Sequence, residues 1–243
     1  MNKKKIALLL TCVLLLCCVV GGTMAWLTAT TEEVVNTFTI GDINIELLEH
    51  DYVPETQTLN KEADPVKANT DYLFVPGDTL PKDPFVTVEA GSEACYLFIK
   101  VEELNNSCEV TVDNQKITVN PILDWTHRDV WTVYKKESTD TVTYLYKKVD
   151  AATAEAGATW FILEDDQITV SEDVIKEMVP IINAVNSTVT PAVQPNLPKL
   201  LFDACAVQLD NLADEVAPAG ATEEQIAAVE AENIAAAFAQ TKW

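Results

Sequence analysis

The sequence contains little histidine, little glycine and few basic residues. Its two histidines, His50 and His127, are far apart in the chain, and neither lies in a His-Glu-x-x-His motif. A zinc protease of that type needs two imidazoles on one helix face, with a glutamate base between them. The sequence also has no Gly-x-Ser-x-Gly elbow and no phosphate-binding loop. It therefore predicts no catalytic residue, no metal ligand and no cofactor.

Positive charge is scarce as well. The 243 residues include 38 acidic and 16 basic side chains, for a net charge of −22. An acidic surface repels the phosphate backbone, so this balance argues against a nucleic-acid partner. Hydrophobic residues make up 48% of the chain and charged residues 22%, which is ordinary for a folded domain with a sizeable core.

The first 25 residues have the pattern of a secretory signal. Three lysines precede an apolar run from Ile6 to Val20, and small residues, Thr23 and Ala25, follow a Gly-Gly pair. This pattern predicts cleavage after Ala25 and a mature chain that begins at Trp26, with a net charge of −25. The competing interpretation is an uncleaved anchor, because the run extends to Leu27 and about 20 residues span a bilayer. The predicted location is secreted, in the extracellular matrix or at the cell surface.

The body of the chain is dominated by short strand patterns. Apolar and polar residues alternate in segments about ten residues apart, with turn residues between them, which is typical of an antiparallel sandwich or barrel. The expected organisation is a signal (1–25), a short N-terminal segment (26–35), an all-β sandwich (36–212) and an Ala-rich C-terminal helix or tail (213–243). Strands are expected at 38–47, 85–88, 96–101, 109–113, 116–119, 130–135, 142–147, 160–163 and 200–209.

Two helices and one long loop are expected besides these strands. Ser171 has the features of an N-cap, and the helix after it should end at Pro180. Thr222 and Gln225 form a capping-box pattern before an Ala-rich helix that continues to about Gln240. Its narrow apolar stripe suggests a helix that rests on the sandwich or projects from it, and a disordered tail is the alternative. Residues 51–81 are rich in turn formers and are expected to be loop.

Several other groups have competing structural and functional interpretations. The mature chain's Cys95, Cys108 and Cys205 are expected to be small buried thiols, with a bridge from Cys205 as the alternative. The acidic run 164–166 is a candidate for Ca²⁺ binding, but a solvated turn is the favoured interpretation. Strand aromatics could form a sugar-stacking platform, although such residues more often fill a core. They are Trp125, Trp131, Tyr134, Tyr144, Tyr146 and Trp160.

Three blocks of sequence resemble the TasA/camelysin family of exported proteins. The first joins the signal to residues 36–47, Asn-Thr-Phe-Thr-Ile-Gly-Asp-Ile-Asn-Ile-Glu-Leu. The second is the turn Pro76-Gly77-Asp78 followed by Lys82-Asp83 and by the strand 96–101. The third is Ala-Cys-Ala-Val-Gln at 204–208, which is similar to the last strand of the family. Cys205 and the Ala-rich C-terminal piece depart from the family pattern.

The resemblance implies a jelly-roll sandwich exported by a Gram-positive bacterium. It implies processing by a SipW-type signal peptidase, and family members polymerise into biofilm matrix fibres. The expected function is therefore that of a secreted structural matrix protein that binds copies of itself, with other matrix proteins as further candidate partners. Camelysin also carries a metalloendopeptidase label, so a secreted endopeptidase is one alternative. A monomeric surface adhesin is another.

The expected route to fibres is strand addition through the new N-terminus. Residues 26–35 are short and tethered just before the first strong strand, and cleavage releases them. An extended segment from a neighbouring molecule can satisfy the unpaired N–H and C=O groups of an open sheet edge. The resemblance points to the same segment. The residues assigned to it are Trp26, Leu27, Thr28, Thr30, Val34 and Val35.

Overall fold

The computed structural model describes residues 43–69, 72, 74–136, 141–182, 197–209, 217 and 220–243. The chain divides into one unit over Met1–Asn36 and another over Thr37–Trp243, and every described residue belongs to the second. The signal, its cleavage site and the N-terminal assembly segment lie outside the described residues, as does the first part of the expected strand at 38–47.

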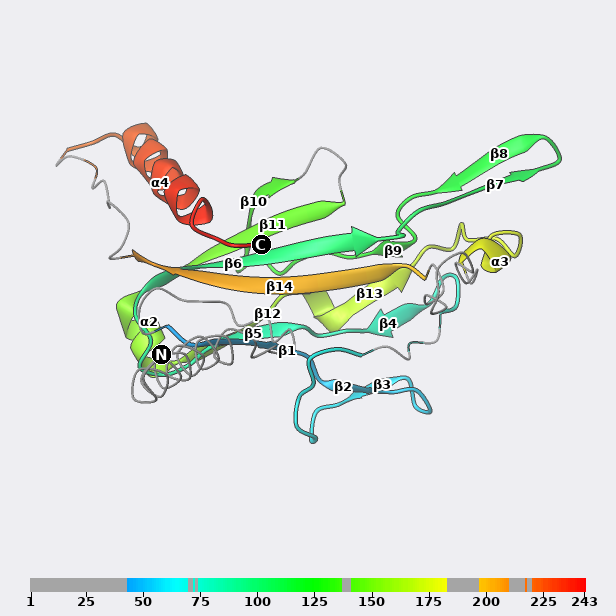
Figure 1. Ribbon diagram of the computed structural model, residues 1–243, viewed down its shortest axis with the longest axis horizontal. Helices are drawn as coiled ribbons and strands as arrows, with labels where there is room; N and C mark the ends of the chain where they lie inside the picture. The colour runs from blue at the N-terminus through cyan, green and yellow to red at the C-terminus, as the bar shows by residue number, and fades with distance from the viewer. Residues whose placement is uncertain are drawn as a thin grey trace, which may run out of the picture. The chain divides into compact units, whose positions relative to one another are not determined.

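A four-stranded antiparallel sheet is the largest element of the fold (Figure 1). Its two longest strands, β6 inside the sheet and β14 at one edge, are paired with each other over ten residues. The order across the sheet is β10 (Thr132–Lys136), β11 (Val142–Val149), β6 (Cys95–Leu104) and β14 (Lys199–Gln208).

Two three-stranded sheets and two hairpins complete the strand structure. One sheet has the order β1 (Ile45–Leu48), β5 (Phe85–Val88) and β12 (Ala158–Phe161). The other has the order β4 (Thr79–Pro81), β13 (Gln167–Val170) and β9 (Leu123–Asp124). The hairpins are β2 (Asp51–Val53) with β3 (Thr58–Asn60), and β7 (Cys108–Val112) with β8 (Gln115–Val119).

The main core lies between the four-stranded sheet and the sheet β1-β5-β12. Side chains alternate between the two faces of a strand, and the odd-numbered residues of β6 enter this core together with Val86 and Val88 of β5. A second cluster joins β4, β9 and β13 to Leu200 at the start of β14. All strand pairs among the described residues are antiparallel, so the prediction of an all-β, sandwich-like fold is confirmed.

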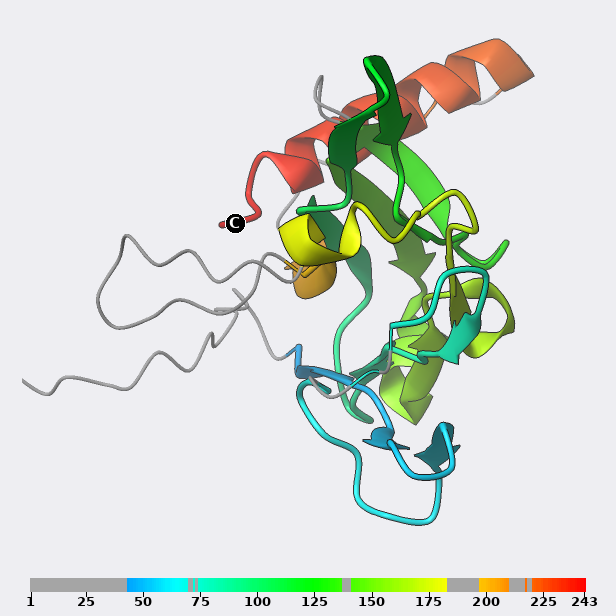
Figure 2. The ribbon, with the colours of Figure 1, turned by 90° about the vertical axis from the view of Figure 1, so that its right-hand side faces the viewer.

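The other face of β6 is covered by the C-terminal helix α4 (Glu223–Phe238). Tyr96 and Phe98 point away from the sandwich core and pack with Ile234 and Ala237 of the helix. Figure 2 shows α4 running across the outside of the four-stranded sheet. Because both faces are covered, residues 95–99 of β6 are all buried, which explains why the sequence there is a continuous apolar run rather than an alternating one.

The helices agree only in part with the sequence predictions. The capping box of α4 is confirmed, since Thr222 and Gln225 exchange both of its hydrogen bonds. The helix expected after Ser171 is wrong, because residues 171–178 contain turns and irregular backbone but no helix. The helix α3 (Val179–Ile182) instead begins just before Pro180. Proline has no N–H to donate, and the first turn of a helix needs none, so Pro180 starts this helix instead of ending it.

Two further helical segments were not expected. The short helix α2 (Ala151–Ala156) is capped by Asp150, whose side chain accepts a hydrogen bond from the backbone N–H of Thr153. That carboxylate is stabilised by the Thr153 bonds, which lower the pKa of Asp150. The 3₁₀ turn η1 (Glu164–Asp166) covers the acidic run.

The region 51–81 is not simply loop, so that prediction is wrong in part. It contains β2, β3 and β4. Each has three residues, and such short strands leave almost no alternation in the sequence to recognise. They are strands because of the partners that they pair with. β2 and β3 pair with each other, and β4 pairs with β13, which lies far along the chain.

Two smaller predictions are confirmed. Cys95, Cys108 and Cys205 are buried free thiols. The turn of the β7–β8 hairpin is formed by Asp113 and Asn114, which both have positive φ, as a two-residue type I′ turn requires. None of the helices in the described part of the chain is long and apolar enough to cross a membrane.

Candidate functional site

The Pro76-Gly77-Asp78 motif forms a tight turn at the start of β4. The Asp78 N–H donates to the Val75 carbonyl at 3.1 Å, and Gly77 has φ +84°, a conformation that side chains rarely adopt. Two more backbone hydrogen bonds join the turn to Val170, the last residue of β13. The Gly77 N–H donates to the Val170 carbonyl at 3.0 Å, and the Val170 N–H donates to the Asp78 carbonyl at 2.8 Å. The turn therefore fixes where β4 begins.

Lys82, directly after β4, forms a buried ion pair. Its Nζ lies 2.7 Å from Oε2 of Glu49, and the two side chains are only 10% and 6% exposed. The ammonium also lies 5.3 Å from the ring centre of Tyr72 and 5.7 Å from that of Phe202. A charge removed from water in this way is stable only with a close partner, so the two charges depend on each other.

Asp83, the next residue, is fully buried and is paired with His50. Its Oδ1 accepts the His50 backbone N–H at 3.0 Å, and its Oδ2 lies 2.6 Å from His50 Nδ1. The imidazole packs against Phe85, with ring centres 5.3 Å apart. Two consecutive residues after β1 thus hold two consecutive residues after β4. We call Glu49, His50, Lys82 and Asp83 the paired clamp.

Asn69 holds the outer side of the paired clamp. Its backbone N–H donates to Glu49 Oε1 at 2.6 Å, and its side-chain amide donates to the His50 carbonyl at 2.8 Å. Its Oδ1 accepts the backbone N–H of Tyr52 at 2.8 Å. Both carboxylate oxygens of Glu49 are therefore used, one by Lys82 and one by Asn69.

The electrostatics of the site also affect a neighbouring tyrosine. The ring of Tyr72 stacks on that of Tyr52, with centres 4.4 Å apart. Burial and then the negative charges of Glu49 and Asp83 raise the pKa of Tyr72 well above its usual range. The phenol therefore stays neutral at pH values at which an exposed tyrosine ionises.

The acidic turn 164–166 is stabilised by cations of the protein itself. Asp166 receives Arg128 Nη2 at 2.6 Å and Lys61 Nζ at 3.4 Å. Lys61 also lies 3.9 Å from Asp83, so it links this surface pair to the paired clamp. The Asp166 carboxylate is thus engaged by two side chains of the protein itself.

The paired clamp connects two segments that are distant in the sequence. It ties the β1–β2 connection to the β4–β5 connection and so sets the register of β1 against β5. Among the described residues there is no group of three or more His, Cys, Asp and Glu side chains that could hold a metal ion. His127 is used elsewhere: its Nδ1 lies 3.1 Å from the Arg128 carbonyl.

The strand aromatics do not form one platform. Trp131 is buried in the main core and donates from Nε1 to the Phe161 carbonyl at 2.9 Å. Trp125 and Trp160 pack against the same core, whereas Tyr134, Tyr144 and Tyr146 lie on the outer face of the four-stranded sheet. The interpretation that they fill cores is the better one for the tryptophans.

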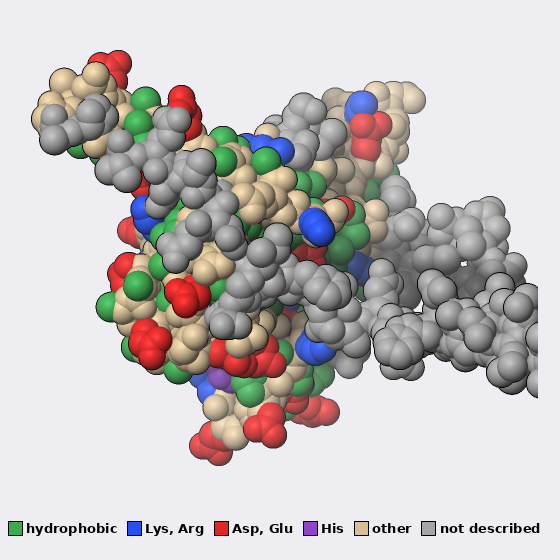
Figure 3. Space-filling view, turned by 60° about the vertical axis from the view of Figure 1, so that its left-hand side comes forward, with side chains coloured by type: hydrophobic (Ala, Val, Ile, Leu, Met, Phe, Trp, Pro, Cys, Tyr) green, Lys and Arg blue, Asp and Glu red, His purple; other side chains and the backbone are tan. Residues whose placement is uncertain are grey.

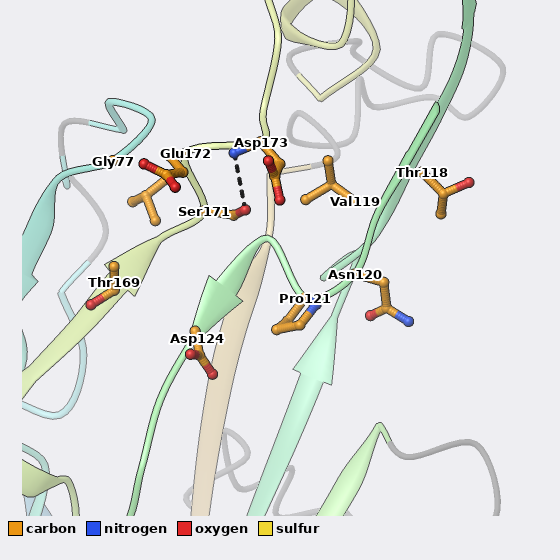
Figure 4. Close-up of a pocket in the computed structure, with 11 residues that line it drawn as sticks. Gly77, Thr118, Val119, Asn120, Pro121, Asp124, Thr169, Ser171, Glu172 and Asp173 are labelled. Atoms are coloured by element: carbon orange, nitrogen blue, oxygen red, sulfur yellow. Dashed lines mark hydrogen bonds between the residues drawn. The ribbon is translucent and has the colours of Figure 1, made fainter. Parts of the chain in front are cut away.

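A surface cavity of about 450 Å³ lies beside the Pro76-Gly77-Asp78 turn (Figure 4). Its wall combines Gly77 with the base of the β7–β8 hairpin and the end of β13. Asp124, Glu172 and Asp173 contribute carboxylates to it. The Oγ of Ser171 accepts the Asp173 N–H at 3.3 Å, which orders the turn on one side of the cavity.

The surface reflects the acidic composition. Figure 3 shows Asp and Glu side chains distributed over the visible face, with fewer Lys and Arg side chains among them. Neutral side chains separate the acidic groups, so the charge is spread rather than gathered into one patch. On this face, repulsion between molecules would come from dispersed charges rather than from a single patch.

The structure brings only some of the sequence-predicted residues together. Pro76, Gly77 and Asp78 lie at one end of β4, and Lys82 and Asp83 lie at the other. Sequence reasoning missed Glu49 and Asn69, and it considered His50 only as a zinc ligand. The available signal was the pair of ionisable residues, Glu49 and His50, directly after an apolar strand.

The fold and this site define an all-β protein in which the motif turn and the paired clamp lie at opposite ends of β4. Neither models of known protein families nor curated protein sequences give a match to the chain. The resemblance to the TasA/camelysin family therefore rests on the sequence blocks named above.

Proposed function

We propose that this protein is a secreted structural component of an extracellular or biofilm matrix, built as a jelly-roll sandwich and joined into fibres by strand addition. The observation that carries the proposal is that the motif block 76–83 makes structural contacts at both of its ends. Its turn is hydrogen-bonded to β13, and its Lys82-Asp83 pair is buried in the paired clamp. These are roles in holding strands in register, which suit a subunit that must keep its edges in a fixed geometry.

The residues just before β1, which follow the N-terminal segment in the chain, are held by the fold. Ile43, the first described residue, is buried, and the Asn44 carbonyl accepts the Glu89 N–H at 2.9 Å. The paired clamp then fixes the far end of β1. An N-terminal segment released by cleavage would therefore start from a rigid strand and could extend toward a neighbouring molecule. Contacts of this head-to-tail kind do not close and produce filaments.

Removal of the N-terminal segment tests the proposal. A mature chain that lacks residues 26–33 should fold but fail to form fibres, as judged by electron microscopy and light scattering. A matched variant keeps the length but replaces these residues with a Gly/Ser stretch, which pairs poorly as a strand. We expect it to behave like the deletion. Fibres formed by either variant at the rate of the intact protein would contradict strand addition.

The charge of the mature chain predicts a strong effect of salt. At a net charge of −25, like-charge repulsion opposes association, and the Debye length falls from about 30 Å at 0.01 M to about 8 Å at 0.15 M salt. Fibre growth of the intact protein, followed by light scattering, should therefore be faster at the higher ionic strength. A rate that falls with added salt would mean that attraction between opposite charges drives assembly instead.

The endopeptidase alternative is separated by a different measurement. The purified mature protein should not digest casein, with or without a chelator. Cleavage that a chelator abolishes and that His50→Ala removes would establish the enzyme instead.

A further inference from the structure

The outer face of the four-stranded sheet carries a cluster of aromatic side chains that α4 covers. Tyr96 and Phe98 of β6 are fully buried there, and Tyr144 of β11 is nearly so. Tyr134 and Tyr146 lie beside them, partly exposed. This face is separate from the sandwich core, because its residues alternate with the ones that face inward.

One end of the helix makes nearly all of this contact. The ring of Phe238 lies between those of Phe98, Tyr134 and Tyr144, at centre distances of 5.5, 4.6 and 4.9 Å. Trp243 adds a contact to Tyr144 at 5.9 Å. The aromatic end of the chain therefore acts as the anchor of α4.

The other end of the helix is largely uncovered. Asn233, Ile234 and Ala237 are its buried residues, and Ile226, on the N-terminal half of the same stripe, is 48% exposed. The sequence of α4 itself favours the helical state. It is rich in alanine, the best helix former, and the Thr222–Gln225 capping box pairs N–H groups at the start of the helix. The helix thus depends on the sheet for a small contact only.

The connection to the sheet does not restrict α4 to its own molecule. β14 ends at Gln208 and α4 begins at Glu223. The length of chain between them can span more than about 40 Å, at roughly 3.3 Å per residue. The sixteen-residue helix is itself only about 24 Å long.

The helix is acidic, and the face that it covers carries two lysines. The helix contains Glu223, Glu224, Glu230 and Glu232, and it has no basic residue between Glu223 and Phe238. The aromatic face carries Lys135, whose Nζ lies 4.8 Å from the Phe238 ring centre, and Lys148, whose Nζ lies 5.5 Å from that of Tyr96. In a strongly acidic protein, this is a surface that an acidic helix from another molecule can approach.

We propose that α4 is exchanged between copies of this chain, so that the helix of one molecule docks on the aromatic face of another through the contact seen within one molecule. The contact needs no new surface, which is the usual basis of domain swapping. Its partner is a second copy, and it does not depend on the N-terminal segment. In a fibre it would connect neighbouring subunits from the side.

Concentration decides between the two arrangements. A covalent connection between a segment and its site holds the segment there at an effective concentration in the millimolar range. In dilute solution α4 therefore stays on its own sheet. In a dense matrix the copies are present at comparable concentrations, and docking on a neighbour becomes competitive.

An engineered disulfide can link an exchanged helix covalently to the molecule on which it docks. Cys205 lies under the C-terminal end of the chain, and its sulfur faces the Lys242 backbone N–H. One chain, called the acceptor, keeps Cys205 and Lys242. The other, the donor, carries Lys242→Cys with Cys205→Ser, so that neither chain can form this bridge alone. The two are mixed, held at about 1 mM or about 10 µM, and oxidised. Peptide mapping by mass spectrometry then identifies a 205–242 bridge between chains.

We expect bridged dimers at 1 mM and at least about tenfold less at 10 µM, as a millimolar effective concentration requires. A single chain with Cys205 and Lys242→Cys is the positive control, and it should form the bridge within one molecule at either concentration. Phe238→Ala in the donor should reduce the dimer. Absence of the dimer at 1 mM while the single chain bridges fully would overturn the proposal. Failure of the single chain to bridge would overturn the docked geometry on which it rests.

Discussion

The paired clamp and the α4 contact both hold distant parts of the chain together, but by opposite physical means. The clamp uses four ionisable groups that are largely removed from water, and each lies within 2.7 Å of an ionisable partner. The α4 contact uses aromatic rings at the edge of the fold, and most of the helix remains in solvent. A buried ion pair cannot be half broken without leaving a charge unpaired, whereas a peripheral apolar contact can open and close again.

Removal of one partner of the paired clamp should have the largest effect. Lys82→Ala leaves the Glu49 carboxylate buried with only the Asn69 N–H as its donor, and breaking a buried pair costs about 3–5 kcal/mol of unfolding free energy. Urea or thermal unfolding measures this loss. The exposed Lys61, which also approaches Asp83, provides a control, because Lys61→Ala should change stability by less than about 1 kcal/mol.

The double variant Glu49→Gln with Lys82→Met makes this prediction more specific. Once both charges are gone, no unpaired charge is buried, and most of the lost stability should return. If the double variant is as unstable as Lys82→Ala, the energy lies in packing and not in the ion pair. The clamp would then resemble the α4 contact more closely than the geometry suggests.

High pH should lower the stability of the fold mainly through the sandwich core and less through the region under α4. Burial raises the pKa of Cys95 from its ordinary 9.0 to about 12. Between pH 9 and 12 the unfolded chain releases this proton and the folded chain does not, so stability falls as pH rises. The slope for one such group is about 1.4 kcal/mol per pH unit.

Unfolding of Cys95→Ala as a function of pH measures this contribution. The variant should show a shallower fall in stability between pH 9.5 and 11 than the parent chain. Tyr72, whose pKa is also raised, lowers stability equally in both chains over this range, so the difference between them reports Cys95 alone. Equal slopes would show that Cys95 gains access to water before the chain unfolds.

The smallest expected effect concerns the anchor of α4. Phe238→Ala should weaken docking of the helix by about 1–2 kcal/mol, less than a core phenylalanine, because the ring is only partly buried. Reaction of Cys205 with a thiol reagent should then become roughly 5–30 times faster. Cys95, on the opposite face of the sheet, should react at an unchanged rate. Faster reaction of both thiols would mean that the helix and the core open together.

The sequence predicts those parts of the fold that depend on neighbouring residues. The hairpin turn at Asp113-Asn114 and the capping box at Thr222 are local patterns, and both are found. The short strands β2, β3 and β4 are decided by their pairing partners, and they were missed. The helix at Pro180 was misplaced because proline marks either the end or the first turn of a helix.

The paired clamp shows the same limit at the level of the site. Lys82 and Asp83 were recognised as a motif, but their partners lie 33 residues earlier in the chain. Nothing in the spacing of Glu49 and His50 indicates that these two residues, rather than other acidic or aromatic ones, meet the motif. Only the register of β1 against β5 brings them together.

Strand β6 separates two interiors that share no side chain. Residues 95, 97, 99 and 101 fill the space between the sheets, and residues 96 and 98 fill the space under the helix. A change of side-chain volume at Leu97 is therefore felt by the sandwich, and one at Phe98 is felt by α4. The helix contact can be redesigned, tightened or removed from the outside while the core on the other side of the same strand keeps its shape.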